Sequence, residues 1–267
     1  MVSCASRLSM AANHTVSASL SVGVTGHRSD RPGRGTPDVE AARRALASVL
    51  AAVRQAARAS RGPVAAGDES DPSCVPAAGG CGLHLISALA PGADQWAAAE
   101  ALDLGYLLRV VLPLDRTTSR EDASGGDAER AAEFDRLLRC AVSVTELGGT
   151  RTRTPDGLLR PDRVAYLLAG RAVLQRSDLL LALWDGQPAR GTGGTGQIVE
   201  EALGEGVPVV WLPWMAPLSW RVLDPARPGG FAAAPGPRDA SALAQMVKQR
   251  LPPALRYATL EESEGQA

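Results

Sequence analysis

Lysine is almost missing from this sequence of 267 residues: Lys248 is the only one, and every other member of its 28 basic residues is an arginine. Acidic residues number 29, so the net charge is −1. Proteins that bind DNA or anionic membranes through charge alone carry a positive excess, which this chain lacks. It also lacks an apolar run of the roughly 20 residues that would span a bilayer. We therefore expect neither nonspecific DNA binding nor a membrane partner.

Cysteine is also scarce, and the four cysteines, Cys4, Cys74, Cys81 and Cys140, contain no Cys-x-x-Cys pair. Cys74 and Cys81 with His84 come nearest to a ligand set, but their spacing fits no zinc pattern. We expect no metal site. Free thiols are typical of a reducing compartment, which favours a cytoplasmic protein.

What the sequence does have is 45% hydrophobic residues, arranged in alternating strand-like and helix-like segments. Short apolar runs predict strands over Ser19–Thr25, Leu83–Leu89, Leu107–Leu112, Val142–Leu147, Leu179–Trp184 and Pro208–Leu212. Apolar residues at helical spacing predict helices over Asp38–Ala59, Ala93–Leu104, Asp127–Cys140, Asp162–Arg176 and Thr195–Gly204. This alternation predicts an α/β, Rossmann-like fold with a doubly wound, mainly parallel sheet flanked by helices.

The chain is expected to divide into three parts. Residues 1–17 are predicted to be a flexible leader, and residues 18–213 the Rossmann-like domain. Within that domain, residues 61–80 are rich in Gly, Pro, Ala and Asp without periodicity, which predicts a disordered insertion. Residues 214–267 are predicted to form an irregular C-terminal extension with one short helix near Ala240–Leu251.

A glycine-rich turn follows the most apolar strand. Leu179–Leu183 is a continuous apolar run, as expected for a strand buried on both faces of a parallel sheet. The segment Gly193-Gly194-Thr195-Gly196 then opens a helix. Bare backbone N–H groups and the positive helix end can face an anion there, and the Thr195 hydroxyl adds a donor. This pattern predicts a phosphate site; a flexible surface loop is the alternative.

Other polar turns follow other strands. In a doubly wound sheet, such turns meet beyond the carboxyl ends of the strands, where the strand order reverses. Three of them are expected to join the glycine-rich turn around one ligand. The predicted ligand-binding residues are Gly26, His27, Arg28, Gly92, Asp94, Asp185, Gly186, Gly193, Gly194, Thr195 and Gly196.

The side chains in these turns allow different roles. Arg28 has a planar fork that can bind two phosphate oxygens. His27 either bonds a base or phosphate or caps local structure, and Asp94 either caps the next helix or accepts from a ribose hydroxyl. Asp185, at a strand end, is expected to face the cleft. Tyr166 belongs either to the core or to a surface that stacks on a base.

Four motifs occur in this order: Val22-Gly-Val-Thr-Gly-His-Arg28, Ala88-Leu-Ala-Pro-Gly-Ala-Asp94, the helix Ala165–Arg171, and Leu183-Trp-Asp-Gly186 with Gly193-Gly-Thr195. Together they resemble the SLOG superfamily of Rossmann-like domains, over about Ser19 to Leu212. That superfamily includes the LOG phosphoribohydrolases and the DNA-processing protein DprA. The resemblance implies a nucleotide or nucleotide-derived ligand, and many such domains are sensor modules of bacterial defence or stress systems.

The resemblance also offers an enzymatic alternative, a LOG-like N-glycosidase acting on nucleoside monophosphates. LOG enzymes carry Pro-Gly-Gly-x-Gly-Thr-x-x-Glu, in which the glutamate works at the ribose. Thr195 matches the threonine, but Ile198 stands at the glutamate position and Glu201 lies one helical turn further on. Arg171 matches the LOG site arginine, although an exposed or helix-capping role fits it equally. No catalytic group is assigned, and Glu201 and Arg171 remain the candidates.

The expected function is therefore binding, and hence sensing, of a nucleotide-derived small molecule, with no cofactor besides that ligand. Single-stranded DNA binding of the DprA type is the least favoured option because the charge balance opposes it, and no nucleic-acid partner is expected. Two protein partners stay open, a second copy of the chain in a homo-oligomer and a separate effector protein.

Overall fold

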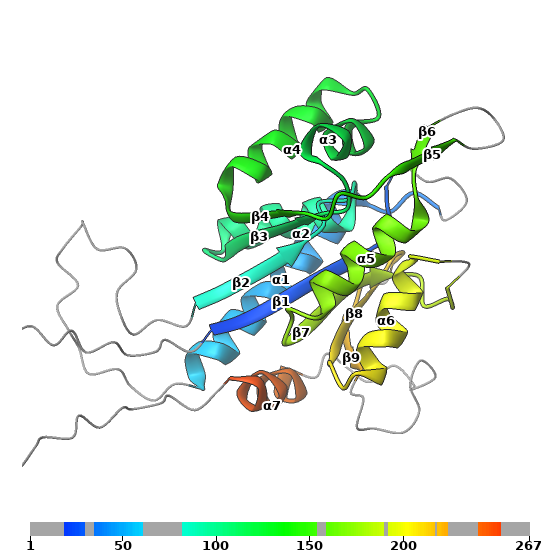
Figure 1. The fold of residues 1–267 in the computed structure, drawn as a ribbon. Coiled ribbons are helices and arrows are strands. Elements are labelled where there is room, and N and C mark those ends of the chain that lie inside the picture. The colour runs from blue at the N-terminus through cyan, green and yellow to red at the C-terminus, as the bar shows by residue number, and fades with distance from the viewer. Residues whose placement is uncertain are drawn as a thin grey trace, which may run out of the picture.

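The computed structural model describes residues 19–29, 35–60, 82–153, 159–189, 192–216, 218–223 and 240–251. The predicted leader and the predicted insertion at residues 61–80 lie outside these ranges, as does most of the chain after residue 223. The described residues form strands and helices in alternation around one main sheet (Figure 1).

Within these ranges, seven strands form the main sheet in the order β4–β3–β2–β1–β7–β8–β9. Neighbours are parallel except β8 and β9, which are antiparallel. The strands are β1 (Ser19–Gly26), β2 (Gly82–Ser87), β3 (Leu107–Leu112), β4 (Ala141–Glu146), β7 (Leu179–Trp184), β8 (Val209–Pro213) and β9 (Arg221–Leu223). The predicted α/β fold with a mainly parallel sheet is confirmed.

Helices cover both faces of the sheet. One layer contains α1 (Val39–Ala59), α2 (Ala93–Asp103), α4 (Ala128–Cys140) and α7 (Ala240–Arg250), and the other contains α5 (Arg163–Leu174) and α6 (Thr195–Gly204). The odd-numbered residues of β7 pack with the first layer and the even-numbered residues with the second. A strand between two layers buries both faces, which explains its continuous apolar run. None of the helices in the described ranges is long and apolar enough to cross a membrane.

The strand order reverses beside β1. β1 pairs with β2 on one side and with β7 on the other, and Gly26 lies opposite Leu183 at the last of these pairs. The chain builds one half of the sheet from β1 to β4, then returns through α5 to build the other half from β7 onward. The loops after β1, β2 and β7 therefore lie together at one edge of the sheet.

One helix was not predicted from the sequence: α3 (Arg116–Ser124), which follows β3. Asp115 caps its start by accepting the Thr118 N–H at 2.9 Å, and Gly125 ends it in the left-handed region with a φ of 58°. The segment is strongly polar, so it lacks the apolar spacing by which a helix is recognised in sequence. Its caps were the available signal.

Two short strand pairings were also missed. β5 (Arg151–Arg153) pairs antiparallel with β6 (Leu159–Pro161). β9 adds an antiparallel edge strand in the region predicted to be irregular. Strands of three residues are too short for a periodic pattern to show. The short helix predicted near Ala240–Leu251 is present as α7.

Candidate functional site

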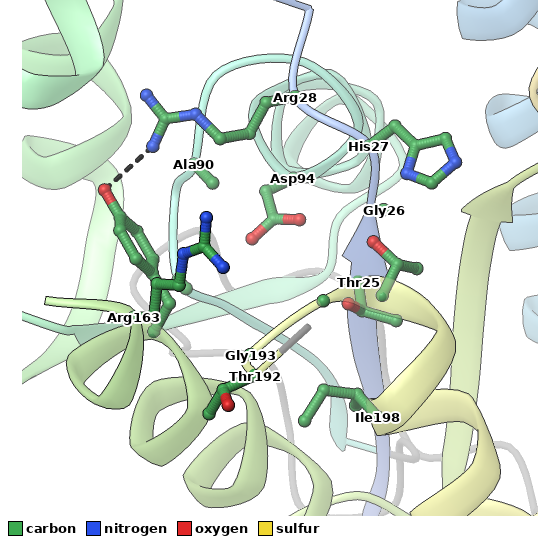
Figure 2. Close-up of a pocket in the computed structure, with 14 residues that line it drawn as sticks. Thr25, Gly26, His27, Arg28, Ala90, Asp94, Arg163, Thr192, Gly193 and Ile198 are labelled. Carbon is green, nitrogen blue, oxygen red and sulfur yellow. Dashed lines mark hydrogen bonds between the residues drawn. The ribbon is translucent and has the colours of Figure 1, made fainter. Parts of the chain in front are cut away.

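A pocket of about 280 Å³ opens at the carboxyl ends of β1, β2 and β7 (Figure 2). It lies where the strand order reverses, the usual place for a ligand in a doubly wound sheet. Its wall is built by the end of β1 and the two residues after it, the loop from β2 into α2, the start of α5, and the glycine-rich turn into α6.

Most of the ligand-binding residues predicted from the sequence line this pocket: Gly26, His27, Arg28, Asp94, Gly193, Gly194 and Thr195. Gly92, Asp185 and Gly186 lie in the adjoining turns instead, and Gly196 lies in the first turn of α6. The wall also contains residues outside the predicted ligand-binding set, among them Ala88, Ala90, Arg163 and Thr192. One signal could have identified Arg163. It directly follows the capping residue Asp162, at the start of a helix that leads back to the sheet centre.

The glycine-rich turn presents an uncapped helix end to the pocket. Gly194 is the N-cap of α6, and no side chain caps the N–H groups of the first turn. Gly193 has a φ of 79°, and a Cβ atom there would lie 2.6 Å from the carbonyl oxygen of Arg163. The turn therefore requires glycine at this position. The first N–H groups of a helix have no acceptor within it, so those of Thr195 and Gly196 form a site for an anion, whereas the Gln197 N–H donates to the Gly194 carbonyl oxygen at 3.0 Å.

Side chains of α5 and α6 brace this turn from outside the pocket. The Gly193 N–H donates to Gln197 Oε1 at 2.9 Å, and Gln197 Nε2 donates to Glu201 Oε1 at 3.0 Å. Arg171 donates to both oxygens of Glu201, at 2.7 and 2.8 Å, and these bonds hold the pKa of Glu201 below its usual range. Neither catalytic candidate lines the pocket, whereas Ile198 does.

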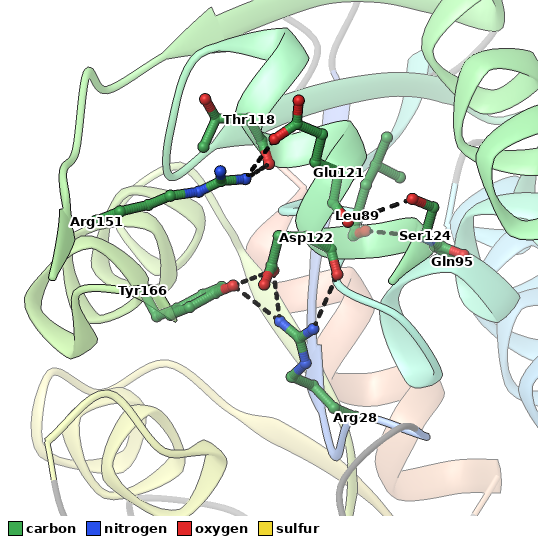
Figure 3. Close-up of polar contacts among 9 residues, drawn as sticks. All are labelled: Arg28, Leu89, Gln95, Thr118, Glu121, Asp122, Ser124, Arg151 and Tyr166. Carbon is green, nitrogen blue, oxygen red and sulfur yellow. Dashed lines mark hydrogen bonds and ion pairs between the residues drawn. The ribbon is translucent and has the colours of Figure 1, made fainter. Parts of the chain in front are cut away.

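Arg28 is bound to the protein itself at the pocket wall (Figure 3). Its Nη1 donates to Asp122 Oδ2 and to the Tyr166 hydroxyl, each at 2.8 Å, and its Nη2 donates to the Asp122 carbonyl at 3.3 Å. The Tyr166 hydroxyl also donates to the Asp122 carboxylate, and burial raises the pKa of Tyr166. Tyr166 thus lines the pocket as part of a polar cluster that attaches α3 to the end of β1.

We expect Arg28→Ala to lower the free energy of unfolding by about 1–3 kcal/mol, because the Asp122 carboxylate loses its cation in a place only 20% exposed. Chemical denaturation of the ligand-free protein measures this. Arg116→Ala is the matched control, since its partner Glu146 is 37% exposed and such surface pairs contribute about 1 kcal/mol or less. Equal, small losses of the free energy of unfolding in both variants would contradict a structural role for Arg28.

His27 ties the ends of β1 and β7 together. Its ring is buried, and its Nε2 lies 3.1 Å from both the backbone nitrogen and Oδ1 of Asp185. The ring also meets the edge of Trp214 at 5.3 Å between centroids. Of the two roles left open by the sequence, these contacts support the structural one. Asp185 is engaged with this ring at the border of the site.

The glycines beside the pocket are explained by close packing. A Cβ atom at Gly92, Gly186 or Gly196 would lie 3.0 Å or less from a neighbouring atom. At Gly26, which lines the pocket, it would lie 2.2 Å from the Cβ of Ala93 at the start of α2. These positions bring the turns close enough together to form one wall.

Asp94 is a buried carboxyl group in the first turn of α2, and it lines the pocket. Burial raises its pKa to about 7, although backbone hydrogen bonds from Ala90 and Ala88 and the charge of Arg28 oppose the shift. It does not cap α2, whose N-cap is Gly92. Carboxyl groups with a strongly raised pKa concentrate at functional sites.

In the part of the chain that the structure describes, no three His, Cys, Asp or Glu side chains come together to hold a metal ion. Cys74 and Cys81 lie outside that part, so the ligand set considered from the sequence is not among the described residues.

Comparison with known proteins finds matches among solved structures at low sequence identity. No protein-family model matches the sequence, and a search of curated proteins finds no match. DprA from Streptococcus pneumoniae has a TM-score of 0.41 and 16% identity, over 73% of this chain and 50% of that one. DprA from Helicobacter pylori, described with a single-stranded DNA binding mode, has a TM-score of 0.40 and 14% identity, over 73% of this chain and 66% of that one. The protein TM1055 has a TM-score of 0.31 and 15% identity, over 68% of this chain and 81% of that one. The chain thus spans half to two thirds of the two DprA chains.

Proposed function

We propose that the pocket at the ends of β1, β2 and β7 binds a nucleotide or a nucleotide-derived small molecule. The observation that carries this proposal is the uncapped start of α6, where Gly193, Gly194 and Thr195 line the pocket together with Arg163. Backbone N–H groups at a helix N-terminus favour an anion, and a guanidinium adds a charge-assisted hydrogen bond. A phosphate group has the charge and the acceptor oxygens for this wall.

The rest of the wall suits the organic part of such a ligand. Ala88, Ala90, Ile198 and the ring of Tyr166 supply apolar surface beside the glycine-rich turn. Inorganic phosphate would leave this surface uncovered, whereas a sugar or a base would bury it. The pocket is small compared with the usual range of about 300–1,000 Å³ for ligand sites, so a mononucleotide fits it better than a dinucleotide.

Calorimetric titration with nucleoside mono-, di- and triphosphates, inorganic phosphate and a single-stranded oligonucleotide tests the proposal. Mass spectrometry of small molecules released from the purified protein identifies any ligand carried through purification. We expect at least one nucleotide to bind more tightly than inorganic phosphate. Absence of nucleotide binding to folded protein would contradict the proposal. Tight oligonucleotide binding that weakens steeply with salt would replace it with nucleic-acid binding.

Arg163→Ala tests the cation at the pocket wall. Arg163 is exposed at the start of α5, so we expect a small change in stability and an unfolding midpoint within about 2 °C of the parent protein. Affinity for the best nucleotide should fall about tenfold, as for the loss of one hydrogen bond to a charged group. Arg176→Ala, just beyond the other end of α5, is the matched control. Equal affinities in the two variants would exclude Arg163 from the site.

An N-glycosidase is the second candidate, and Asp94 is the observation that favours it. A carboxyl group with a pKa near neutrality, enclosed in a ligand pocket, meets the requirement for general acid–base catalysis. Glu201, by contrast, is held by Arg171 outside the pocket. Chromatographic detection of free base measures this activity. Release of free base from a nucleoside monophosphate at about 1 per second, with loss of this release in Asp94→Asn, would establish catalysis in place of binding alone.

A further inference from the structure

Among the described residues that line the pocket, Asp94 is the one acidic residue, and its carboxyl group can accept hydrogen bonds from a ligand. Figure 2 shows its carboxyl group pointing into the pocket from the first turn of α2. The first N–H groups of α6 and the guanidinium of Arg163 are donors that suit phosphate oxygens, whereas the Gly193 N–H is already bonded to Gln197. One wall of the pocket therefore suits an anion, and Asp94 suits a group that carries hydrogens.

The backbone uses only part of the hydrogen-bonding capacity of Asp94. Its carboxyl group accepts from the backbone N–H groups of Ala90 and Ala88. A carboxylate offers about four acceptor positions on its two oxygens, so positions remain for a ligand on the side that lines the pocket. A phosphate has no hydrogens to offer when fully ionised and would be repelled by the carboxylate. A pair of neighbouring hydroxyl groups can donate to both oxygens.

We propose that Asp94 binds the 2′- and 3′-hydroxyls of a ribose, so that the site selects ribonucleotides over 2′-deoxyribonucleotides. This inference rests on the proposed nucleotide-binding function. Asp94 would place the sugar with its diol toward α2 and its phosphate toward the start of α6. Burial keeps the ligand-free carboxyl group protonated below about pH 7, and hydrogen bonds donated by a diol would favour its ionised, accepting form.

Calorimetry with matched ribo- and deoxyribonucleoside 5′-monophosphates tests the selection. With the parent protein, we expect the ribonucleotide of the best-binding pair to bind about tenfold more tightly, which corresponds to one hydrogen bond to a charged group. In Asp94→Asn, the ratio of the two affinities should fall below about threefold, mainly through loss of ribonucleotide affinity. Asp135→Asn changes a half-buried carboxylate that is paired with Arg120; it is the matched control and should keep the parent ratio.

The outcomes separate this inference from the proposed function. Equal affinities of the parent protein for both sugars would overturn the inference and leave nucleotide binding intact. A loss of both affinities by the same factor in Asp94→Asn would assign Asp94 to loop structure and overturn it as well. Failure of every nucleotide to bind the folded parent protein would overturn the proposed function and the inference with it.

Discussion

Gly194→Asp is expected to abolish nucleotide binding and to leave the fold intact. Gly194 has a φ of −85° and a ψ of 159°, an extended conformation that aspartate adopts without strain. Aspartate is a preferred N-cap, because its carboxylate accepts from the first N–H groups of the helix. The new side chain would thus occupy the proposed phosphate position and repel a phosphate near it. Losing two charge-assisted hydrogen bonds of about 1.5 kcal/mol each lowers affinity by about a hundredfold or more.

Gly194→Asn separates charge from occupancy in this experiment. Asparagine caps a helix about as well as aspartate but carries no charge. We expect it to weaken binding less than aspartate does, while both variants unfold at or slightly above the midpoint of the parent protein. Calorimetry and thermal unfolding of the two variants give both quantities. Unchanged affinity in folded Gly194→Asp would place the ligand away from α6.

The stability of the ligand-free protein should depend on the ionisation of Asp94. Burial raises its pKa to about 7 from the usual 3.8. Between these values the folded protein keeps the proton and the unfolded chain releases it. The contribution of Asp94 to the free energy of unfolding therefore falls by about 1.4 kcal/mol per pH unit as the pH rises, until the folded state also ionises near pH 7. This contribution of Asp94 is fully present only below the usual pKa of 3.8.

Asp94→Asn removes this dependence because asparagine stays neutral. From pH 5 to pH 8, we expect the stability of the variant relative to the parent protein to increase by about 2–3 kcal/mol, which is two pH units of lost proton binding. Chemical denaturation of both proteins at the two pH values measures it. Asp135→Asn is the control. The difference between its free energy of unfolding and that of the parent protein should change little between the two pH values. Parallel pH profiles of Asp94→Asn and the parent would mean that Asp94 is not buried in solution.

Some features of the fold follow directly from local sequence. The apolar run of β7 predicts a strand covered on both faces, and the structure places helices on both of its faces. The polar helix α3 and the short strands β5, β6 and β9 carried no such pattern, since their positions depend on caps and on pairing with distant residues. Periodicity reports burial, and α3 buries little apolar surface, whereas strands of three residues are too short to show a period.

The site was predictable in part for the same reason. The turns after β1, β2 and β7 lie at strand ends, so the topology of a doubly wound sheet brings them together. The pairing of Arg28 with Asp122, 94 residues away, follows from no local pattern. This pairing gives the Arg28 side chain a structural partner, where its sequence context favoured a phosphate partner.

The sequence alone determined the doubly wound sheet and the glycine-rich start of α6, because strand burial, helix periodicity and glycine requirements act over a few neighbouring residues. The tertiary structure decided which side chains enter the pocket. It placed Arg163 and Asp94 in the wall, and it bound Glu201 to Arg171 outside it. Those assignments depend on charge pairing and desolvation between segments far apart in the chain, which only the packed fold brings within hydrogen-bonding distance.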